Sequence, residues 1–346
     1  MSETSRCPPT VPPSVAVVIP YYNGARFIER ALDSVFAQSE PAREVVVVND
    51  GSRPDERQFL HGLTARYPFK LIDQDNGGQG SARNAGVAAS TSDFICFLDQ
   101  DDFYLEHHIR ILARAIPSDE PRFGYVYGDL AEADGDGRII RASMVKEHSA
   151  HPKQSIFDML RNDIFVLPSA ALISRRAFEA VGGFDTQFMG FEDDDLFLRI
   201  FREGYTNHFV DKVVTVWCIH TGSTSFDVRM IRSRFKYFRK LVGMFPDEPR
   251  RNRFYLRDHL MPRFGRYFVD HVIEATKAGD ESRVEMSGIL AEYASIVNAN
   301  PSVGRLAKAK LNATVFMVQH SPPSLIRTIG AITKLPGLRA LRRMLG

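Results

Sequence analysis

The chain has 346 residues, of which 44% are hydrophobic and 25% charged, a composition typical of a globular protein with one large domain plus an extension, or with two domains. Its three cysteines, Cys7, Cys96 and Cys218, are far apart, which excludes a disulfide framework or a CxxC metal site and favours a reducing, cytoplasmic compartment. Residues 1–225 hold 22 of the 44 Lys and Arg but 32 of the 42 Asp and Glu, so their net charge is −10 and that of the remainder is +12.

The first 14 residues, MSETSRCPPTVPPS, are polar and rich in proline. This composition predicts a disordered leader and not a secretory signal. The sequence contains no run of 18 or more uncharged apolar residues, so we expect no transmembrane helix.

Strands that alternate with helices are predicted in the first hundred residues. VAVVI at 15–19 and EVVVV at 44–48 are apolar without alternation, as in strands covered on both faces, and residues 25–38 between them have helical spacing. Pro20 is expected to end the first strand. Further strands are predicted at 69–72 and 94–98, and helices at 55–67 and 81–89. This order predicts a mostly parallel sheet, whose ligand sites lie beyond the carboxyl ends of the strands.

The pattern is looser beyond residue 102. We predict a helix at 105–115, strands near 125–126, 170–173 and 213–219, and a helix that begins near Glu192. Helical patterns dominate from Phe226 onward, with breaks at prolines. The predicted fold class is an α/β domain over residues 15–225, after the leader at 1–14, with a basic and mainly helical extension over 226–346.

The stretch NDGS at 49–52 follows the second predicted strand. A tight Asp-Gly turn alone would explain it. At the carboxyl end of a parallel strand, the Asp50 carboxylate could also accept hydrogen bonds from a nucleobase or a ribose hydroxyl.

The glycine-rich stretch NGGQGSARNAG at 76–86 has the composition of a phosphate-binding loop before a helix. It lacks the GK[ST] ending of a Walker motif and the third glycine of a dinucleotide fingerprint. Arg83 can donate several hydrogen bonds to a base or to a phosphate oxygen. Glycines required only for a loop and for close helix packing would give the same pattern, and both interpretations stay open.

At 96–102, CFLDQDD, an apolar run ends in three carboxylates. Crowded carboxylates repel one another and resist losing water unless a cation lies among them. If the strand continues, Asp99 and Asp101 point to one side and Gln100 to the other. Mn²⁺ or Mg²⁺ prefers oxygen ligands and bridges carboxylates to a diphosphate, with His220 as a candidate third ligand. A solvated acidic loop and a structural histidine are the alternatives.

GFEDDDL at 190–196 places four acids in the first turn of a predicted helix. The helix dipole favours acids there, which explains some of them. Four in succession exceed what this requires, so one of them is a candidate general base for an attacking hydroxyl.

Taken in order, these stretches resemble the family-two inverting glycosyltransferases, which have the GT-A fold. The matching pieces are VVIPYYN at 17–23, VVVVNDGS at 45–52, NGGQGSARNAG at 76–86, FLDQDD at 97–102, GGFDTQFMGFEDDDLFLR at 182–199 and HTGSTS at 220–225. They span about two thirds of the chain. The resemblance implies a Rossmann-like, mostly parallel mixed sheet flanked by helices. It also implies inverting transfer of a sugar from a nucleoside-diphosphate sugar, with a UDP-sugar as the first expectation, to an acceptor hydroxyl.

The resemblance implies roles for individual residues. The nucleotide-contacting residues are expected to be Pro20, Tyr22, Asp50, Arg83 and Asp99. Asp101, with Asp99 and His220, is expected to hold the Mn²⁺ or Mg²⁺ cofactor. Asp193 corresponds to the catalytic base and Glu192 to a support of the acceptor pocket. Because Asp194 and Asp195 prolong the acidic run, the register of the base stays open by one residue.

The resemblance also bears on the acceptor. A glycan or a lipid-linked glycan is expected, in the synthesis of cell-surface polysaccharide or of a lipid-linked glycan. The Gln-x-x-Arg-Trp motif of processive synthases is missing, and Trp217 is the single tryptophan, which disfavours long-chain polymerisation.

The basic C-terminal part has two interpretations. RMIRSRFKYFRK at 229–240 interleaves cations with apolar residues, and the final LRALRRMLG places leucines beside arginines. Such helices can lie on an anionic membrane, here the inner face of the plasma membrane. The alternative is a helical appendage packed on the catalytic domain. Nucleic-acid binding is not expected, because no recognition motif is present.

Two other functions stay open. A nucleotidyltransferase would carry a glycine-rich loop with a basic residue near the first strand, where this chain has PYYN. A catalytically silent nucleotide-sugar-binding module would keep the fold without turnover. The intact acids Asp50, Asp99, Asp101 and Asp193 disfavour that second alternative.

Overall fold

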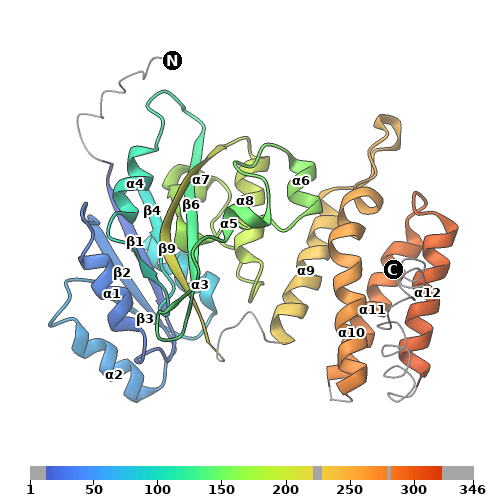
Figure 1. The fold of residues 1–346 in the computed structure, drawn as a ribbon, viewed down its shortest axis with the longest axis horizontal. Helices are drawn as coiled ribbons and strands as arrows, with labels where there is room; N and C mark the ends of the chain where they lie inside the picture. The colour runs from blue at the N-terminus through green and yellow to red at the C-terminus, as the bar shows by residue number, and fades with distance from the viewer. Residues whose placement is uncertain (1–12, 221–227, 279–281, 322–346) are drawn as a thin grey trace. The chain divides into compact units, whose positions relative to one another are not determined.

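The computed structural model describes residues 13–220, 228–278 and 282–321 (Figure 1). They form two compact units, one of residues 13–159 and 163–220, the other of residues 160–162, 228–278 and 282–321. Most of the predicted leader and the tail from residue 322 lie outside the described residues. Within the described ranges, none of the helices is both long and apolar enough to cross a membrane.

The first unit is built on a mixed sheet. Its elements, in chain order, are β1 (Val15–Tyr21), α1 (Ile28–Phe36), β2 (Glu44–Asp50), α2 (Pro54–Leu63), β3 (Lys70–Gln74), α3 (Gln79–Ala88), β4 (Phe94–Phe97), β5 (Phe103–Tyr104), α4 (His108–Arg114), β6 (Phe123–Asp134), β7 (Ile139–Arg141), α5 (Val145–His148), the 3-10 turn η1 (Pro168–Ala170), β8 (Ala171–Ser174), α7 (Arg175–Ala180), α8 (Glu192–Arg202) and β9 (Thr206–Ile219). Helix α6 (Ile156–Arg161) begins in this unit, and its last two residues belong to the second. The strand order is β3-β2-β1-β4-β8-β6-β9-β5, and β7 pairs with β6. Strands β1 to β4 are parallel, as are β6 and β9, while β8 is antiparallel to both β4 and β6. The predicted α/β class with a mixed sheet flanked by helices is confirmed, although antiparallel pairings are as frequent as parallel ones.

Helices cover both faces of the parallel part. Right-handed crossovers place α1 and α2 on one face and α3 on the other. Tyr21 reaches α2 and hydrogen-bonds Glu56 at 2.6 Å. Val18 is three residues before Tyr21, so its side chain points to the other face of β1. There it lies against Gly86 of α3, where an added Cβ would come within 2.3 Å of Val18 Cγ1. All seven residues of β1 are therefore buried, as its unbroken apolar sequence predicts.

The first strand does not end at Pro20. It continues to Tyr21, so that expectation is wrong. Strand β4 pairs with β1 only as far as Val18. The missing N–H of Pro20 therefore removes no hydrogen bond from the ladder on that side, and the strand tolerates the proline.

The short elements are the ones that the sequence pattern does not predict. Strands β5 and β7 and helices α5, α6 and α7 have two to six residues each. A segment of that length completes less than two helical turns or only a few strand alternations. It is therefore too short for its hydrophobic residues to show a helical or a strand period. The predicted helix at 81–89 begins two residues earlier, at Gln79, and the one at 55–67 already ends at Leu63.

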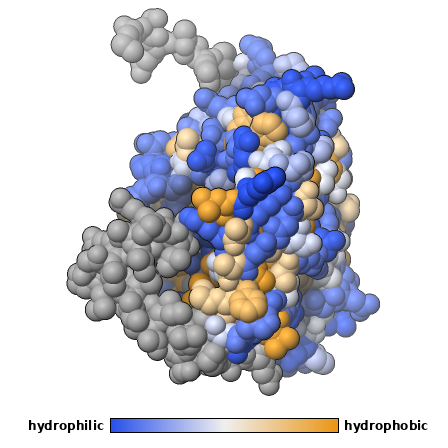
Figure 2. All heavy atoms as spheres, turned by 90° about the vertical axis from the view of Figure 1, so that its right-hand side faces the viewer, coloured by the Kyte–Doolittle hydropathy of each residue, from blue (hydrophilic) through white to orange (hydrophobic). Residues whose placement is uncertain are grey.

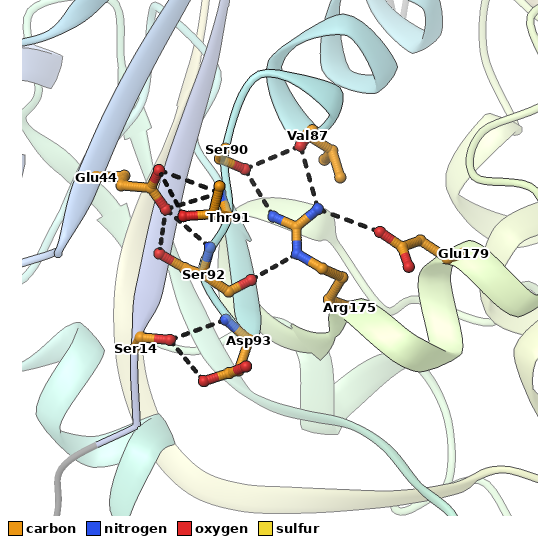
Figure 3. Close-up of polar contacts among 9 residues, drawn as sticks. All are labelled: Ser14, Glu44, Val87, Ser90, Thr91, Ser92, Asp93, Arg175 and Glu179. Carbon is orange, nitrogen blue, oxygen red and sulfur yellow. Dashed lines mark hydrogen bonds and ion pairs between the residues drawn. The ribbon is translucent and has the colours of Figure 1, made fainter.

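Hydrogen bonds fasten the loop between α3 and β4, at the amino end of the parallel strands (Figure 3). The Glu44 carboxylate accepts the backbone N–H groups of Thr91 and Ser92 and both of their hydroxyls. The Arg175 guanidinium donates to the carbonyl oxygens of Ser92 and Val87, and also to the Ser90 hydroxyl. The hydrogen bonds of Glu44 and Arg175 at this end of the sheet are structural contacts that hold the loop in place.

Replacing Glu44 by Gln is expected to lower the free energy of unfolding by about 1–2 kcal/mol at pH 7, because the charged acceptor of four hydrogen bonds is lost. Burial opposes the charge of Glu44, but the bonds from Ser92 and Thr91 outweigh it and lower its pKa. A lowered pKa stabilises the fold above the unfolded-state value of about 4.3. The difference between the variants should therefore shrink as the pH falls through the lowered pKa, which urea unfolding at pH 7 and near pH 4 would measure. Glu179→Gln, at the exposed rim of the same network, is the control and should change stability by less than about 0.5 kcal/mol.

The second unit is helical, as predicted. Its elements are α9 (Val228–Met244), the 3-10 turn η3 (Pro249–Arg251), the π-helical stretch η4 (Leu256–Gly265), α10 (Arg266–Ala278), α11 (Ser282–Ala299) and α12 (Arg305–His320). Its core is an aromatic cluster of Phe238, Phe264, Phe268 and Tyr293, whose contacting ring centroids lie 5.1 to 6.2 Å apart.

The segment 229–240 lies in α9 and is packed. Phe235, Tyr237 and Phe238 are buried, and the basic residues Arg232 and Arg239 form ion pairs with Glu285 and Glu292 of α11. Its apolar side chains already have partners within the unit. These contacts lie within the second unit and do not test packing on the catalytic domain, so both interpretations of the basic C-terminal part stay predictions.

Candidate active site

Polar side chains gather at the carboxyl ends of β1, β2 and β4. Tyr22 follows β1, Asp50 ends β2, and Asp99 to Asp102 follow β4. The amino ends of α3 and α8 supply the remaining groups, because Arg83 of α3 binds both Asp99 and Glu192. The motifs predicted to form one site are thus largely brought together.

Asp50 organises the glycine-rich loop. Its Oδ1 accepts hydrogen bonds from Gln74 Nε2 at 2.7 Å and from the Gly77 N–H at 2.8 Å, and its Oδ2 accepts from the Gly78 N–H at 2.8 Å. Gly78 has φ = 84°, a left-handed value that favours glycine. A carboxylate has about four acceptor positions, so one remains for a ligand. Its predicted contact with a nucleotide stays a prediction.

Arg83 joins the two acidic motifs. Its Nη2 donates to Asp99 Oδ1 at 2.7 Å and its Nη1 donates to Glu192 Oε1 at 2.9 Å, although Glu192 is 109 residues away in the sequence. The guanidinium is 2% exposed and lies 5.1 Å from the Phe184 ring centroid. Burial works against its charge, but Asp99 and Glu192 more than compensate and raise the pKa of Arg83. It therefore stays charged and holds both acids in place.

The acids after β4 lie in a turn. The strand ends at Phe97, and the Asp102 N–H donates to the carbonyl oxygen of Asp99. The expectation that strand alternation sets the directions of Asp99 and Asp101 is therefore wrong, because no strand is present there. Asp99 faces Arg83 and Gln79, whereas Asp101 Oδ2 lies 2.9 Å from His220 Nε2.

Gln100 and Asp102 shape this turn. Gln100 accepts from the Tyr22 N–H and donates to the Tyr22 carbonyl, which ties the turn to the end of β1. Gly24 leaves room for this contact, since an added Cβ would lie 2.2 Å from Gln100 Oε1. Asp102 is buried and accepts the Cys218 N–H at 2.9 Å. Both residues are structural, and the third carboxylate of the motif does not face the site.

Asp101 and His220 are the residues that fit a cation. Burial and Asp99 raise the pKa of Asp101, and His220 opposes this rise. The His220 ring stacks on Phe27, with centroids 4.7 Å apart. Within the ranges that the structure describes, no three His, Cys, Asp or Glu side chains form a metal-binding group, and the part of Asp99 in a metal site stays a prediction. A divalent cation shared with a diphosphate takes only one or two protein ligands, and an adjacent carboxylate and imidazole meet that requirement.

The four acids of α8 differ in accessibility. Glu192, Asp194 and Asp195 are buried, and Asp195 accepts a hydrogen bond from Arg199 Nε at 2.7 Å. Asp193 alone among the four is partly exposed. Burial, followed by the charges of Glu192 and Asp194, raises the pKa of Asp193 well above that of an ordinary aspartate. Such a carboxylate is a stronger base than usual, and of the four acids it is the one that an acceptor can reach.

Arg30 of α1 was not predicted as a site residue. Its Nη2 donates to the carbonyl oxygen of Asp101 at 2.7 Å and lies 3.2 Å from Cys218 Sγ, and its Nη1 donates to the Gly135 carbonyl at 3.3 Å. It also lies over the Phe103 ring. Arg30 thus holds the backbone of Asp101 against the strand that leads to His220. A single arginine within a helical pattern gives no signal of such a contact.

Residues 16–182 match the model of the family described as Glycosyl transferase family 2, and residues 169–221 match the one described as N-terminal domain of galactosyltransferase. An uncharacterized glycosyltransferase of Rickettsia conorii is 32% identical over 200 residues, which are 54% of this chain and 31% of that protein. The alignments with the first curated relatives cover 29 to 32% of the length of those relatives.

Solved structures resemble the whole described fold. S. aureus TarS 1–349 in complex with UDP-GlcNAc has a TM-score of 0.59 at 17% identity, over 95% of this chain and 92% of that one. The mannosyltransferase PcManGT from Pyrobaculum calidifontis, in complex with GDP-Man and Mn²⁺, has a TM-score of 0.56 at 20% identity, over 92% of this chain and 89% of that one. At these identities the similarity concerns the fold. The family match identifies residues 16–182 as a domain of glycosyl transferase family 2, and the structural similarity shows that the fold is GT-A.

Proposed function

We propose that the protein is an inverting glycosyltransferase that moves a sugar from a nucleoside-diphosphate sugar to an acceptor hydroxyl. The observation that carries this proposal is the double ion pair of Arg83 with Asp99 and Glu192. It places the acids after β4, which suit a donor diphosphate and its cation, beside the acidic run that contains Asp193. Membership of family 2 supports sugar transfer and favours it over nucleotidyl transfer. Turnover would exclude the silent binding module.

Asp193 is proposed as the general base. An acceptor hydroxyl attacks the anomeric carbon from the face opposite the diphosphate, its proton passes to the Asp193 carboxylate, and the bond to the diphosphate oxygen breaks. A single displacement of this kind inverts the configuration. Glu192, fixed by Arg83, is proposed to support the acceptor pocket.

The donor pocket is proposed at the ends of β1 and β2. The Tyr22 side chain is 50% exposed there, which leaves its ring free to pack on a base. The proposed direct nucleotide contacts are Pro20, Tyr22, Asp50 and Asp99. Since Arg83 is enclosed, we assign it an indirect part, through the position of Asp99. The UDP-GlcNAc and GDP-Man in the structures of the similar proteins support a nucleotide-sugar donor, with a UDP-sugar as the first choice.

Asp101 and His220 are proposed to hold a Mn²⁺ or Mg²⁺ ion, with Asp99 nearby. When bound, the ion would neutralise charge on the departing diphosphate. The Mn²⁺ in the PcManGT structure supports this choice of cofactor. The chain itself contributes the orientation of Asp101, through Arg30, and of the His220 ring, through Phe27.

The acceptor is proposed to be a glycan or a lipid-linked glycan, in cell-surface polysaccharide or lipid-linked glycan synthesis. A lipid-linked acceptor would place the enzyme at the inner face of the plasma membrane as a peripheral protein.

Incubation with a panel of nucleotide sugars, with and without Mn²⁺, tests this function. We expect release of nucleoside diphosphate with one or a few donors, dependent on the cation, and a product whose anomeric configuration is inverted by NMR. Thermal stabilisation by a donor without any release would instead show a binding module. Release of pyrophosphate from a nucleoside triphosphate and a sugar phosphate would show a nucleotidyltransferase.

Replacing Arg30 by Met is expected to weaken Mn²⁺ binding about tenfold in the presence of UDP. The reason is the loss of the charged hydrogen bond that fixes the Asp101 backbone, a contact of the class that contributes about 1.5–3 kcal/mol. Titration of Mn²⁺ followed by electron paramagnetic resonance would measure the affinity without any turnover. Arg114→Met is the control, since Arg114 of α4 is largely exposed and forms an ion pair with Glu40. Equal affinity in both variants would refute the positioning role.

A further inference from the structure

Helix α12 has apolar residues on two sides. Val318 is buried in the second unit. On the opposite side, Leu306 is 73% and Phe316 64% exposed, and Ala309 and Ala313 lie between them and are also exposed. The spacing 306, 309, 313 and 316 places these four residues, here named the outer strip, in one line along the helix. Figure 2 views the side of the second unit on which α12 is drawn in Figure 1, and hydrophobic side chains are visible there among hydrophilic ones.

The charges on α12 itself have one sign. The helix contains Arg305, Lys308 and Lys310 and no Asp or Glu. Arg305 and Lys310 flank the strip, and neither forms an ion pair with any residue that the structure describes. Lys308, which donates to the Asn298 carbonyl, belongs instead to the packed side. An apolar line with unpaired cations at its edges is typical of helices that bind at the boundary between lipid headgroups and acyl chains.

We propose that the outer strip of α12 docks on an anionic lipid bilayer, with Leu306 and Phe316 entering the headgroup layer and Arg305 and Lys310 at the lipid phosphates. Charge complementarity selects this partner. A second copy that docked symmetrically, strip against strip, would bring the same cations face to face, and α12 has no acid to pair them. A nucleic acid would match the cations but would leave exposed Leu and Phe without a role. The proposal goes beyond sugar transfer and does not depend on it.

The expected loss of membrane affinity is estimated separately for the two cations and for the two apolar side chains of the strip. A basic residue near an anionic surface contributes about fivefold in affinity, so replacing Arg305 and Lys310 by Gln should lower binding roughly 25-fold. Replacing Leu306 and Phe316 by Ser should lower it by tenfold or more, because both lose their apolar surface. Both side chains are largely exposed, so neither substitution should change the melting temperature.

Sedimentation of the full chain with vesicles tests the proposal. Vesicles of phosphatidylcholine alone are compared with vesicles that also contain phosphatidylglycerol, at low and at physiological salt. We expect binding only to the anionic vesicles, weakened by salt and by each double variant. The matched control is Val284→Ser on α11, which removes an apolar side chain that is 81% exposed but lies outside the strip, and it should bind like the wild type.

Three results would overturn the proposal. One is equal binding to neutral vesicles. Another is a double variant at 306 and 316 that binds like the wild type. The third is a wild-type protein that self-associates in analytical ultracentrifugation and loses this association in that variant, because the strip would then be an interface between copies. None of these results depends on turnover, so they leave the proposed sugar transfer untouched.

Discussion

Asp193→Asn is expected to lower kcat by about 10² to 10⁴ while donor binding stays nearly unchanged, because a general base contributes a factor of this size. The substitution keeps the shape of the side chain, and the Asn oxygen can still accept the Asp194 N–H that Asp193 Oδ1 accepts at 2.8 Å. Initial rates with saturating donor, and donor titration monitored by calorimetry, would separate the two effects.

The same variant has a distinct pH signature. Because burial, Glu192 and Asp194 raise the pKa of Asp193, wild-type activity should fall as the pH drops through that raised value, and the Asn variant should lack this limb. A raised carboxyl pKa also means that stability falls as the pH rises from the unfolded-state value of about 3.9 to the raised value, and this loss is complete above it. The Asn variant should therefore melt no lower than the wild type at pH 8, and its lost activity cannot then be attributed to unfolding.

Variants of the neighbouring acids show which of the three aspartates, Asp193, Asp194 or Asp195, is the general base. Asp195→Asn should lower stability by about 3–5 kcal/mol, since Asp195 is fully buried and paired with Arg199, and should leave kcat of the folded fraction within a few-fold. Asp194→Asn should likewise retain turnover, because Asp194 is buried whereas Asp193 is partly exposed. A variant at 194 or 195 that loses activity as completely as Asp193→Asn would move the base to that position.

The parallel part of the fold could be predicted because its residues face one kind of environment. Both faces of β1 and β2 are covered, so the two strands are continuous apolar runs. Such a run fits only a strand or a buried helix. Strand β7 has no such signal: Ile139 and Ile140 are both largely exposed, and only pairing with β6 makes them a strand. Pro20 was misjudged because the effect of a proline depends on whether a neighbouring strand faces it, which the sequence does not state.

The candidate site was predictable in its residue types and not in its contacts. Carboxylates at the ends of strands indicate a cation or a sugar nucleotide, and Asp101 and His220 do meet. The sequence assigned Arg83 to the nucleotide, whereas the structure gives it Asp99 and Glu192 as partners, one of them 109 residues away. Gln100, the variable position of the Asp-x-Asp pattern, proved to fix the turn to Tyr22. Long-range pairs of this kind depend on tertiary structure, which a spacing rule cannot provide.

Arg83→Met is expected to disturb both halves of the site at once. It leaves the Asp99 and Glu192 carboxylates without their shared cation, and removing one partner of a buried pair costs about 3–5 kcal/mol of stability. Arg83→Lys should recover part of this loss, because one ammonium group keeps the charge but cannot bridge the two acids as the guanidinium does. Urea unfolding of the three proteins would give this order.

The more specific consequence concerns the base. Arg83 lowers the pKa of Asp193, so its removal should raise that pKa further and move the acid limb of the pH–rate profile to higher pH. Arg175→Met is the matched control: Arg175 is also a mostly buried arginine beside α3, but it binds carbonyl groups at the amino end of β4. Arg175→Met should lower the free energy of unfolding, but activity should fall at the same acidic pH as in the wild type. If both variants share one pH profile, Arg83 merely fills the core, and the coupling between the donor acids and the base that the double ion pair implies does not exist.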